Sequence, residues 1–258
     1  MGNPLIPPDG VYQLSAHRLN MMRNCPYSCY LYLSHFQEGE TDDCWAKCGS
    51  AVHDYAEDMA KGQVKDPEYY INKWEVPPTN STGINIHDRF YKCLENVPRF
   101  AKAGGIPELT EFTKFITPKG RTVNLQTRID LQIEDSQLEE AKGKVVVDYK
   151  TGRDVNKDEY KLQARCYMFA KNGEYKALFY SLLTGKYFVI DKSPMEYIPK
   201  ICDEYIDHIE NRDFPRTPNS MCNSFCPYYD LYCKPNVYFQ ELIPPADKKK
   251  EESVDDTD

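Results

Sequence analysis

The chain has 258 residues, a formal net charge of -8 at pH 7 and a hydrophobic fraction of 41%. These values fit one soluble globular domain, or one domain with appendages. No apolar run approaches the roughly 20 residues that span a bilayer, and the first ten residues lack the basic start and apolar core of a signal peptide. We therefore expect an intracellular, cytoplasmic protein with no membrane partner. The charge argues against a general nucleic-acid binder, although residues 247–258 contribute -3 of it, from three lysines and six acids.

Helical patterns dominate the first hundred residues. The expected helices cover residues 11–37, 42–61 and 84–103. Ser15 is the N-cap of the first helix, Pro26 interrupts it, and Pro98 bends the third. Residues 65–83 contain prolines and an Asn-Ser-Thr-Gly run, which predict an irregular connection.

The period of the apolar residues then changes to two. Residues 109–117 alternate, and residues 123–134 carry apolar side chains on one face and polar side chains on the other, which predicts two strands. Three consecutive valines within residues 144–150 predict a buried strand. Because the last two strands are close in sequence, we expect a hairpin that places Asp130 beside Asp148.

The remainder of the chain returns to helices around one more hairpin. We expect a helix over 157–170, a hairpin formed by 175–183 and 186–190, a helix over 195–210, and a loop-rich segment over 217–235. Helices, a short mixed sheet and further helices predict an α/β (α+β) fold. The expected parts are an N-terminal helical segment (1–40), a core (41–215), a C-terminal cysteine segment (216–245) and a disordered charged tail (246–258).

Two charged residues close the valine strand. Asp148 and Lys150 are two residues apart, so they project from the same face, and burying such charges is costly unless they are paired or bind a metal. Asp130 on the neighbouring strand would share a divalent ion with Asp148, and Mg²⁺ or Mn²⁺ prefers oxygen ligands. Lys150 would then lie against a scissile phosphate, and His53 would complete the coordination. Each residue alone also fits a surface or structural role, so the order and spacing of the set carry the prediction.

Four short patterns occur in a fixed order. They are Gly49-x-x-x-His53, Asp130 on a strand, Asp148-x-Lys150 and Gln163-x-x-x-Tyr167. This order resembles the PD-(D/E)xK nuclease superfamily and, more narrowly, the RecB-type nuclease domain. The resemblance implies a restriction-endonuclease-like core and Mn²⁺ or Mg²⁺ as cofactor. The implied ligands are His53, Asp130, Asp148 and the carbonyl of Tyr149. It further implies that Lys150 is catalytic and that Gln163 and Tyr167 contact DNA or support the metal site.

Two positions near the first aspartate are less regular. Members of that family often carry a glutamate on the preceding strand, and Glu111 is the nearest candidate here. The family commonly has Gly-x-Ile/Val-Asp before the metal aspartate, whereas this chain has Thr-Arg-Ile-Asp at residues 127–130. Arg128 is thus on the Asp130 face, where it would either bind phosphate or crowd the site.

Ten cysteines are many for a protein of a reducing compartment, where structural disulfides are disfavoured. Five of them sit within helical patterns and are expected to pack in the core: Cys44, Cys48, Cys93, Cys166 and Cys202. Cys222, Cys226 and Cys233 instead cluster in a loop-rich segment. With one further thiolate they would hold Zn²⁺ or a [4Fe-4S] cluster.

The cysteine arrangement resembles the iron–sulfur branch of RecB-like nucleases, the Cas4-like / AddB-type branch. In that branch one cysteine of a Cys-Pro motif precedes the nuclease core, and three follow it with the spacing Cys-x2-Cys-x5-Cys. Here both gaps are one residue longer. The resemblance implies Cys25 as the fourth ligand, with Cys29 as its rival and Zn²⁺ as the alternative occupant. The cluster is expected to tie the two ends of the chain together.

We therefore expect a metal-dependent deoxyribonuclease, most simply an exonuclease on single-stranded or end-containing DNA. Two alternatives stay open. One is a CRISPR prespacer-processing nuclease with an adaptation or recombination partner, or a homo-oligomer; the other is a non-catalytic DNA-binding scaffold with a structural Fe–S or Zn site. The lysines expected to line a strand channel are Lys92, Lys102, Lys114, Lys161 and Lys171.

Overall fold

The structure is a computed structural model that describes residues 3–39, 42–139, 141–155, 158–219, 222 and 226–234. The predicted tail over 246–258, and part of the predicted cysteine segment, lie outside these residues. No helix in this part of the chain is long and apolar enough to cross a membrane.

One mixed sheet of six strands forms the centre of the molecule. Its strands are β1 (Val11–Ser15), β2 (Ile106–Ile116), β3 (Thr122–Ser136), β4 (Gly143–Lys150), β5 (Lys176–Ser181) and β6 (Tyr187–Ile190). Their order is β1-β3-β4-β5-β6, and β2 pairs with β3 outside that path. The pairs β1–β3 and β4–β5 are parallel, and the other pairs are antiparallel.

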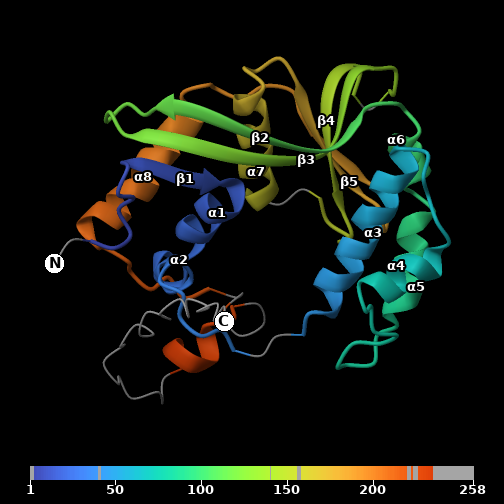
Figure 1. Cartoon of the computed structure of the whole chain (residues 1–258), viewed down its shortest axis with the longest axis horizontal. Coiled ribbons are helices and arrows are strands. Elements are labelled where there is room, and N and C mark those ends of the chain that lie inside the picture. Colours follow the sequence, from blue (N-terminus) through green and yellow to red (C-terminus); the bar gives the residue numbers. More distant parts are fainter. Residues whose placement is uncertain are drawn as a thin grey trace, which may run out of the picture.

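Helices flank this sheet in two groups (Figure 1). They are α1 (Ala16–Asn24), α2 (Pro26–Leu33), α3 (Cys44–Ala60), α4 (Pro67–Lys73), α5 (Ile86–Leu94), α6 (Pro98–Ala101), α7 (Asp158–Ala170) and α8 (Tyr197–Asn211). Figure 1 shows α3 to α6 at one end of the sheet, and α1, α2 and α8 at the other. This arrangement confirms the predicted α/β class with a central mixed sheet.

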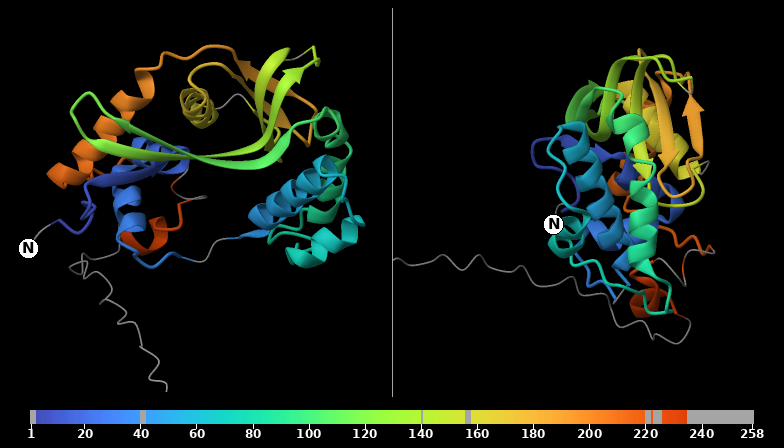
Figure 2. Two further views of the ribbon diagram at one scale, coloured as in Figure 1. Left: turned by 45° about the horizontal axis from the view of Figure 1, so that its top comes forward. Right: turned by 90° about the vertical axis from the view of Figure 1, so that its right-hand side faces the viewer.

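Strand β3 connects the two ends, and Figure 2 shows it running with β2 across the molecule. Its first part pairs with β1 and its last part with β4, while β2 follows it on the other edge. The register with β4 pairs Leu131 with Val147, which confirms the predicted hairpin and brings Asp130 opposite Asp148.

The core is divided between the two helical groups. Val145, Val147 and Leu131 pack in a buried cluster that includes side chains of α3 and α5. Val123 and Leu125 pack in a second cluster with side chains of α1, α7 and α8. Val146, on the other face of β4, packs in a third cluster with side chains of α7. The valine strand is therefore buried as predicted, because both of its faces are covered.

Two predictions for the first hundred residues are wrong. Residues 11–15 form the parallel strand β1 instead of helix: Tyr12 and Leu14 are buried, their neighbours are less so, and helix α1 begins only after Ser15, whose hydroxyl caps it. The region over 65–83 is not irregular throughout, since it contains α4. Pro67 occupies the first turn of that helix, where its missing N–H costs nothing.

Candidate active site

Helix α3 presents His53 to the centre of the sheet. The small residue Gly49 faces the end of β4, where an added Cβ would lie 3.7 Å from Oγ1 of Thr151. This close approach brings Nδ1 of His53 to 3.3 Å from Oδ1 of Asp130 on β3. The predicted histidine and the first predicted aspartate are therefore in contact.

The hairpin of β3 and β4 fixes the two aspartates. The backbone N–H of Tyr149 donates a hydrogen bond to Oδ2 of Asp130 at 2.6 Å. Asp148, one residue earlier on β4, is only 3% exposed. Both aspartates thus project from a buried strand pair, which is more rigid than a loop.

Lys150 forms an ion pair inside this site. Its Nζ lies 2.5 Å from Oδ2 of Asp148 and donates to Oε1 of Gln163 at 3.2 Å. The ammonium also lies 4.7 Å from the ring centroid of Tyr160. Its exposed fraction is 19%, so one side of the ammonium still meets solvent.

Helix α7 supplies polar partners behind Asp148. Gln163 Nε2 donates to Oδ1 of Asp148 at 2.8 Å, and the hydroxyl of Tyr167 lies 2.7 Å from the same oxygen. That hydroxyl is also 2.7 Å from the backbone carbonyl oxygen of Arg128. These contacts occupy one carboxylate oxygen. The other, Oδ2, is buried and has no hydrogen-bond partner within the described residues, although Lys150 faces it.

The glutamate that reaches the site is Glu108, which the sequence had not singled out. Among the described residues, a ligating atom of each of His53, Glu108 and Asp130 lies within 4.8 Å of the other two. Glu111, the residue expected from the strand pattern, instead pairs with Lys171 at 2.5 Å. The difference arises at Glu108 itself, whose φ of 50° interrupts the regular strand next to Pro107.

Arg128 lies on the outer side of this group. Its guanidinium contacts Oε2 of Glu108 at 2.7 Å, and its side chain is 70% exposed. It therefore neither enters the group nor crowds it, and it presents a cation to solvent beside the acids.

The charges of the site support one another. Burial alone raises the pKa of Asp130, but His53 and Lys150 outweigh it and hold that pKa below its ordinary value. Burial, together with the neighbouring Asp130, raises the pKa of Asp148. Burial lowers the pKa of Lys150, but the two aspartates reverse this and raise it. The lysine thus stays cationic at neutral pH.

Carboxylates and one imidazole form a donor set suited to Mg²⁺ or Mn²⁺. The group of His53, Glu108 and Asp130 could hold such an ion. Asp148, which the sequence also predicted as a ligand, is not part of this group among the described residues, and its Oδ2 is paired with Lys150. This geometry resembles that expected for metal-assisted phosphodiester hydrolysis.

Comparison with known proteins decides the family. The sequence profile of the PD-(D/E)XK nuclease superfamily matches residues 13–233, most of the chain. The chain belongs to this superfamily. Membership implies a metal-dependent nuclease.

The comparisons with curated proteins and with solved structures do not refine the family assignment of this nuclease. No curated protein matches it in sequence. One similar solved structure, named "Crystal structure of SSO0001", is 16% identical, covers 83% of this chain and 94% of that chain, and has a TM-score of 0.41.

The nuclease has a second candidate site, in which four cysteines line one cavity. Its volume is about 860 Å³. Cys25 borders it from the N-cap position of α2, and Cys222, Cys226 and Cys233 border it from the C-terminal segment. All four are partly exposed and unbonded to one another by disulfides. Cys29, the rival candidate for the fourth ligand, is fully buried and donates weakly to the Tyr205 hydroxyl at 3.9 Å. Its burial raises the pKa of the thiol to about 11.

Contacts around this cavity join the two ends of the nuclease. The N–H of Gly39 donates to the carbonyl oxygen of Pro227 at 2.8 Å, and the hydroxyl of Tyr228 donates to Glu38 at 2.9 Å. The rings of Phe36 and Tyr232 meet edge to face, with centroids 5.7 Å apart.

The cysteines expected in the core are indeed buried: Cys44, Cys48, Cys93, Cys166 and Cys202.

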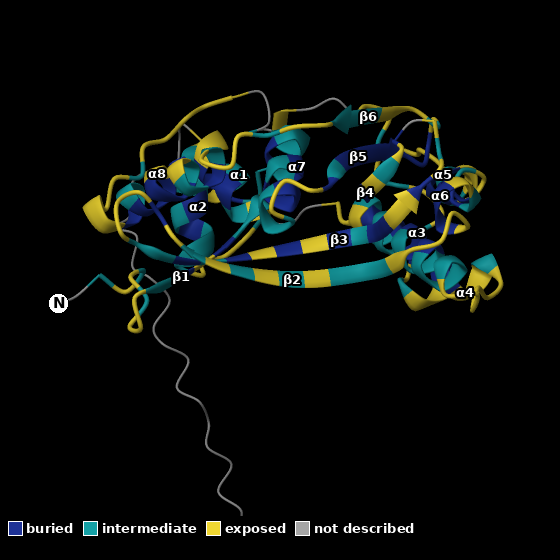
Figure 3. Cartoon of the chain, turned by 90° about the horizontal axis from the view of Figure 1, so that it is seen from above, coloured by how far each residue is buried: buried dark blue, intermediate teal, exposed yellow. Residues whose placement is uncertain are grey.

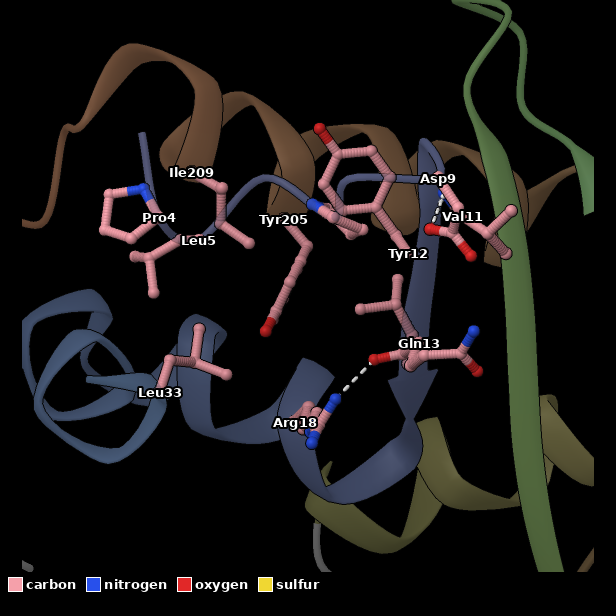
Figure 4. A pocket seen from close by; sticks show the side chains of 12 residues that line it. Pro4, Leu5, Asp9, Val11, Tyr12, Gln13, Arg18, Leu33, Tyr205 and Ile209 are labelled. Carbon is pink, nitrogen blue, oxygen red and sulfur yellow. Dashed lines mark hydrogen bonds between the residues drawn. The ribbon is translucent and has the colours of Figure 1, made fainter. Parts of the chain in front are cut away.

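A further pocket of about 290 Å³ lies between the N-terminal segment, β1, α2 and α8 (Figure 4). Pro4, Leu5 and Ile209 make part of its lining apolar, and the guanidinium of Arg18 donates to the carbonyl oxygen of Gln13 at 2.6 Å. None of the predicted site residues is among the described residues that line it. We assign it to the packing of the N-terminal segment.

Proposed function

We propose that the chain is a divalent-metal-dependent DNA nuclease, and specifically an exonuclease that acts on single-stranded or end-containing DNA. The observation that carries the proposal is the convergence of His53, Asp130, Asp148 and Lys150 from three separate elements. Groups whose pKa values are shifted by burial and by neighbouring charges, as those of Asp130, Asp148 and Lys150 are, cluster at functional sites. Superfamily membership supports the same reading.

The ion would be held by His53, Glu108, Asp130 and Oδ2 of Asp148, with the carbonyl of Tyr149 as a further ligand from the resemblance. When bound, Mn²⁺ or Mg²⁺ screens the phosphate and lowers the pKa of a bound water. Lys150 stays cationic and partly exposed, so it would stabilise the negative charge that develops on the phosphate. Gln163 and Tyr167 would orient Asp148, since their hydrogen bonds fix Oδ1. Oδ2 faces Lys150, so it would have to be shared between that ammonium and the ion.

We also propose that the cysteine cavity holds a [4Fe-4S] cluster through Cys25, Cys222, Cys226 and Cys233. The cavity of about 860 Å³ has room for an occupant larger than a single ion, and four cysteine thiolates are the usual ligands of such a cluster. The contacts between the chain ends support a structural role for it.

The proposed function is tested with end-labelled and closed circular DNA in Mn²⁺, in Mg²⁺ and without added metal. We expect the wild-type protein to shorten linear single strands from an end, only when metal is added, and to leave circles intact. Linear DNA that stays intact in both metals would refute the nuclease. Circles cut as fast as linear strands would refute the exonuclease while leaving a metal-dependent nuclease in place.

A further inference from the structure

One face of the sheet next to the active site is largely exposed. Along β1 and the first part of β3 alternate residues are buried, along β2 the corresponding residues are partly buried, and the residues between them are exposed or partly exposed. We call the latter the open sheet face. It consists of Val11, Gln13, Ser15, Thr110, Phe112, Lys114, Ile116, Thr122, Asn124, Gln126 and Arg128. Among the described residues, helices border this face only at the β1 end, where Gln13, Ser15 and Gln126 line a small pocket with α1 and α2.

The chemistry of the open sheet face is unlike that of the chain as a whole. The chain has a net charge of -8, yet the open sheet face has no acidic side chain and two basic ones, Lys114 and Arg128. Phe112 is 62% exposed and Ile116 is 71% exposed. Figure 3 shows β2 as exposed or intermediate along its length, in contrast to the buried β5. Large apolar side chains this exposed indicate a contact surface.

The open sheet face leads directly into the active site. The register places Glu108 opposite Asp130, between the pairs Pro107–Leu131 and Leu109–Ile129. These two acids belong to the candidate metal group. They lie two residue pairs beyond Thr110 and Arg128 on the same two antiparallel strands. From Thr110 to Ile116 the face extends about 20 Å, the length of about six stacked nucleotides.

We propose that the open sheet face binds the single strand of nucleic acid that enters the active site, with Phe112 stacking on a base. This inference rests on the proposed nuclease function and names the surface by which the substrate is held. A flat sheet with an exposed aromatic residue accepts unpaired bases, because every base has a π-face. The amides of Asn124 and Gln126 supply hydrogen bonds and Lys114 contacts phosphates. Arg128, which is paired with Glu108, lies where the face meets the metal group. Lys161 and Lys171, also expected in a strand channel, instead pair with Asp158 and Glu111.

The rival occupant is a second copy of the chain. Strand β2 is an edge strand, and edge strands offer unpaired backbone groups to another strand. Three observations favour a nucleic acid. The exposed residues span three strands instead of lining the edge. From Thr110 to Ile116 the face carries no acid. The acids on this side of the two strands, Glu108 and Asp130, belong to the metal group into which the face continues.

The test measures binding of labelled oligothymidylate by fluorescence anisotropy, without added divalent metal. Phe112→Ala should weaken binding about 5- to 150-fold, which corresponds to the loss of one stacked base. Lys114→Glu should weaken it and reduce its dependence on salt. Phe112→Trp should retain affinity, and the fluorescence of the new tryptophan should be quenched by the strand. Tyr187→Ala, at a comparably exposed aromatic residue on β6, is the matched control and should change nothing.

Three results would overturn the inference. One is unchanged affinity of Phe112→Ala together with no quenching in Phe112→Trp. Another is equal binding of duplex DNA with the same dependence on Phe112. The third is a dimer in sedimentation that Phe112→Ala converts to a monomer with its affinity for single strands intact. Because no hydrolysis is needed, these outcomes are separate from a failure of the nuclease, which would appear as intact DNA in Mn²⁺.

Discussion

Gln163 donates a hydrogen bond from Nε2 to Oδ1 of Asp148 at 2.8 Å. The same side chain accepts a hydrogen bond from Lys150 through its oxygen. One residue of α7 therefore positions both the carboxylate and the ammonium that β4 contributes two residues apart. Asp148 is buried, whereas the side chain of Lys150 is 19% exposed.

Gln163→Leu should reduce activity about 10- to 100-fold, as is typical when a residue that orients a metal ligand is lost. The variant removes one of the two hydrogen bonds to Oδ1 of Asp148 and the hydrogen bond that Lys150 donates to Gln163, so both side chains are held less firmly. Steady-state kinetics as a function of Mn²⁺ concentration would reveal it as a higher metal requirement. Lys161→Ala, on the exposed side of the same helix, is the control. Equal activity of the two variants would argue against an orienting role.

Glu108→Gln should weaken Mn²⁺ binding by about tenfold or more, because it removes a carboxylate from the metal group. Glu111→Gln should leave Mn²⁺ binding unchanged, since that residue pairs with Lys171 instead. Isothermal titration calorimetry on both variants makes the comparison within one strand. If the Glu111 variant loses the metal and the Glu108 variant keeps it, our placement of the ligands is incorrect.

The contrast between these glutamates marks the limit of sequence reasoning at this site. The order of His53, Asp130, Asp148 and Lys150 could be found because each residue lies in a regular helix or strand with a visible period. Glu108 could not, because a positive φ beside a proline breaks the alternation that locates strand faces. Its contact with His53 joins residues 55 positions apart (108 − 53), which no local pattern records.

Two elements, β1 and α4, are difficult to predict from the sequence for reasons that are equally local. Strand β1 is five residues long and runs straight into a capped helix, so its two buried residues were absorbed into the helical pattern. Helix α4 is hard to predict because its proline, Pro67, usually interrupts helices, although proline in the first turn of a helix is favourable. The long β3 and the buried β4 were correctly predicted because their periods extend over many residues.

Arg121→Gln should destabilise the fold at neutral pH by about 2 kcal/mol. Arg121, at the start of β3, contacts Asp203, Asp207 and Glu210 of α8 and so ties the β2–β3 connection to that helix. Hydrogen bonds from Lys119 and Arg121 lower the pKa of Asp207, and Arg121 lowers that of Glu210.

The pH dependence of this effect has a definite sign. Carboxylates with lowered folded-state pKa values contribute stability above their unfolded values, near pH 4, and lose it as pH falls through the folded values. The difference in Tm between wild type and Arg121→Gln should therefore be largest at pH 7 and shrink toward pH 3. A difference that grows on acidification would contradict the assigned ion pairs.

Cys226→Ala should give an insoluble or colourless protein, because the cluster joins the two ends of the fold and its binding energy is folding energy. Visible absorption and iron and sulfide content measure the cluster, and Tm measures the fold. Cys29→Ala is the control, since that thiol is buried against Tyr205 away from the cavity. A soluble, brown and fully active Cys226→Ala protein would contradict this assignment, and zinc without visible absorption in the wild type would replace the cluster with an ion.

The most direct test of the central claim is the rate at which Lys150→Ala digests end-labelled single-stranded DNA in Mn²⁺. We expect a fall in kcat of about 10²- to 10³-fold, because the variant lacks the cation that stabilises the negative charge developing on the phosphate. Lys144→Ala removes an exposed lysine of the same strand, paired with Glu174, and should digest DNA as the wild type does. Equal rates for wild type, Lys144→Ala and Lys150→Ala, or no digestion by any of the three, would contradict it.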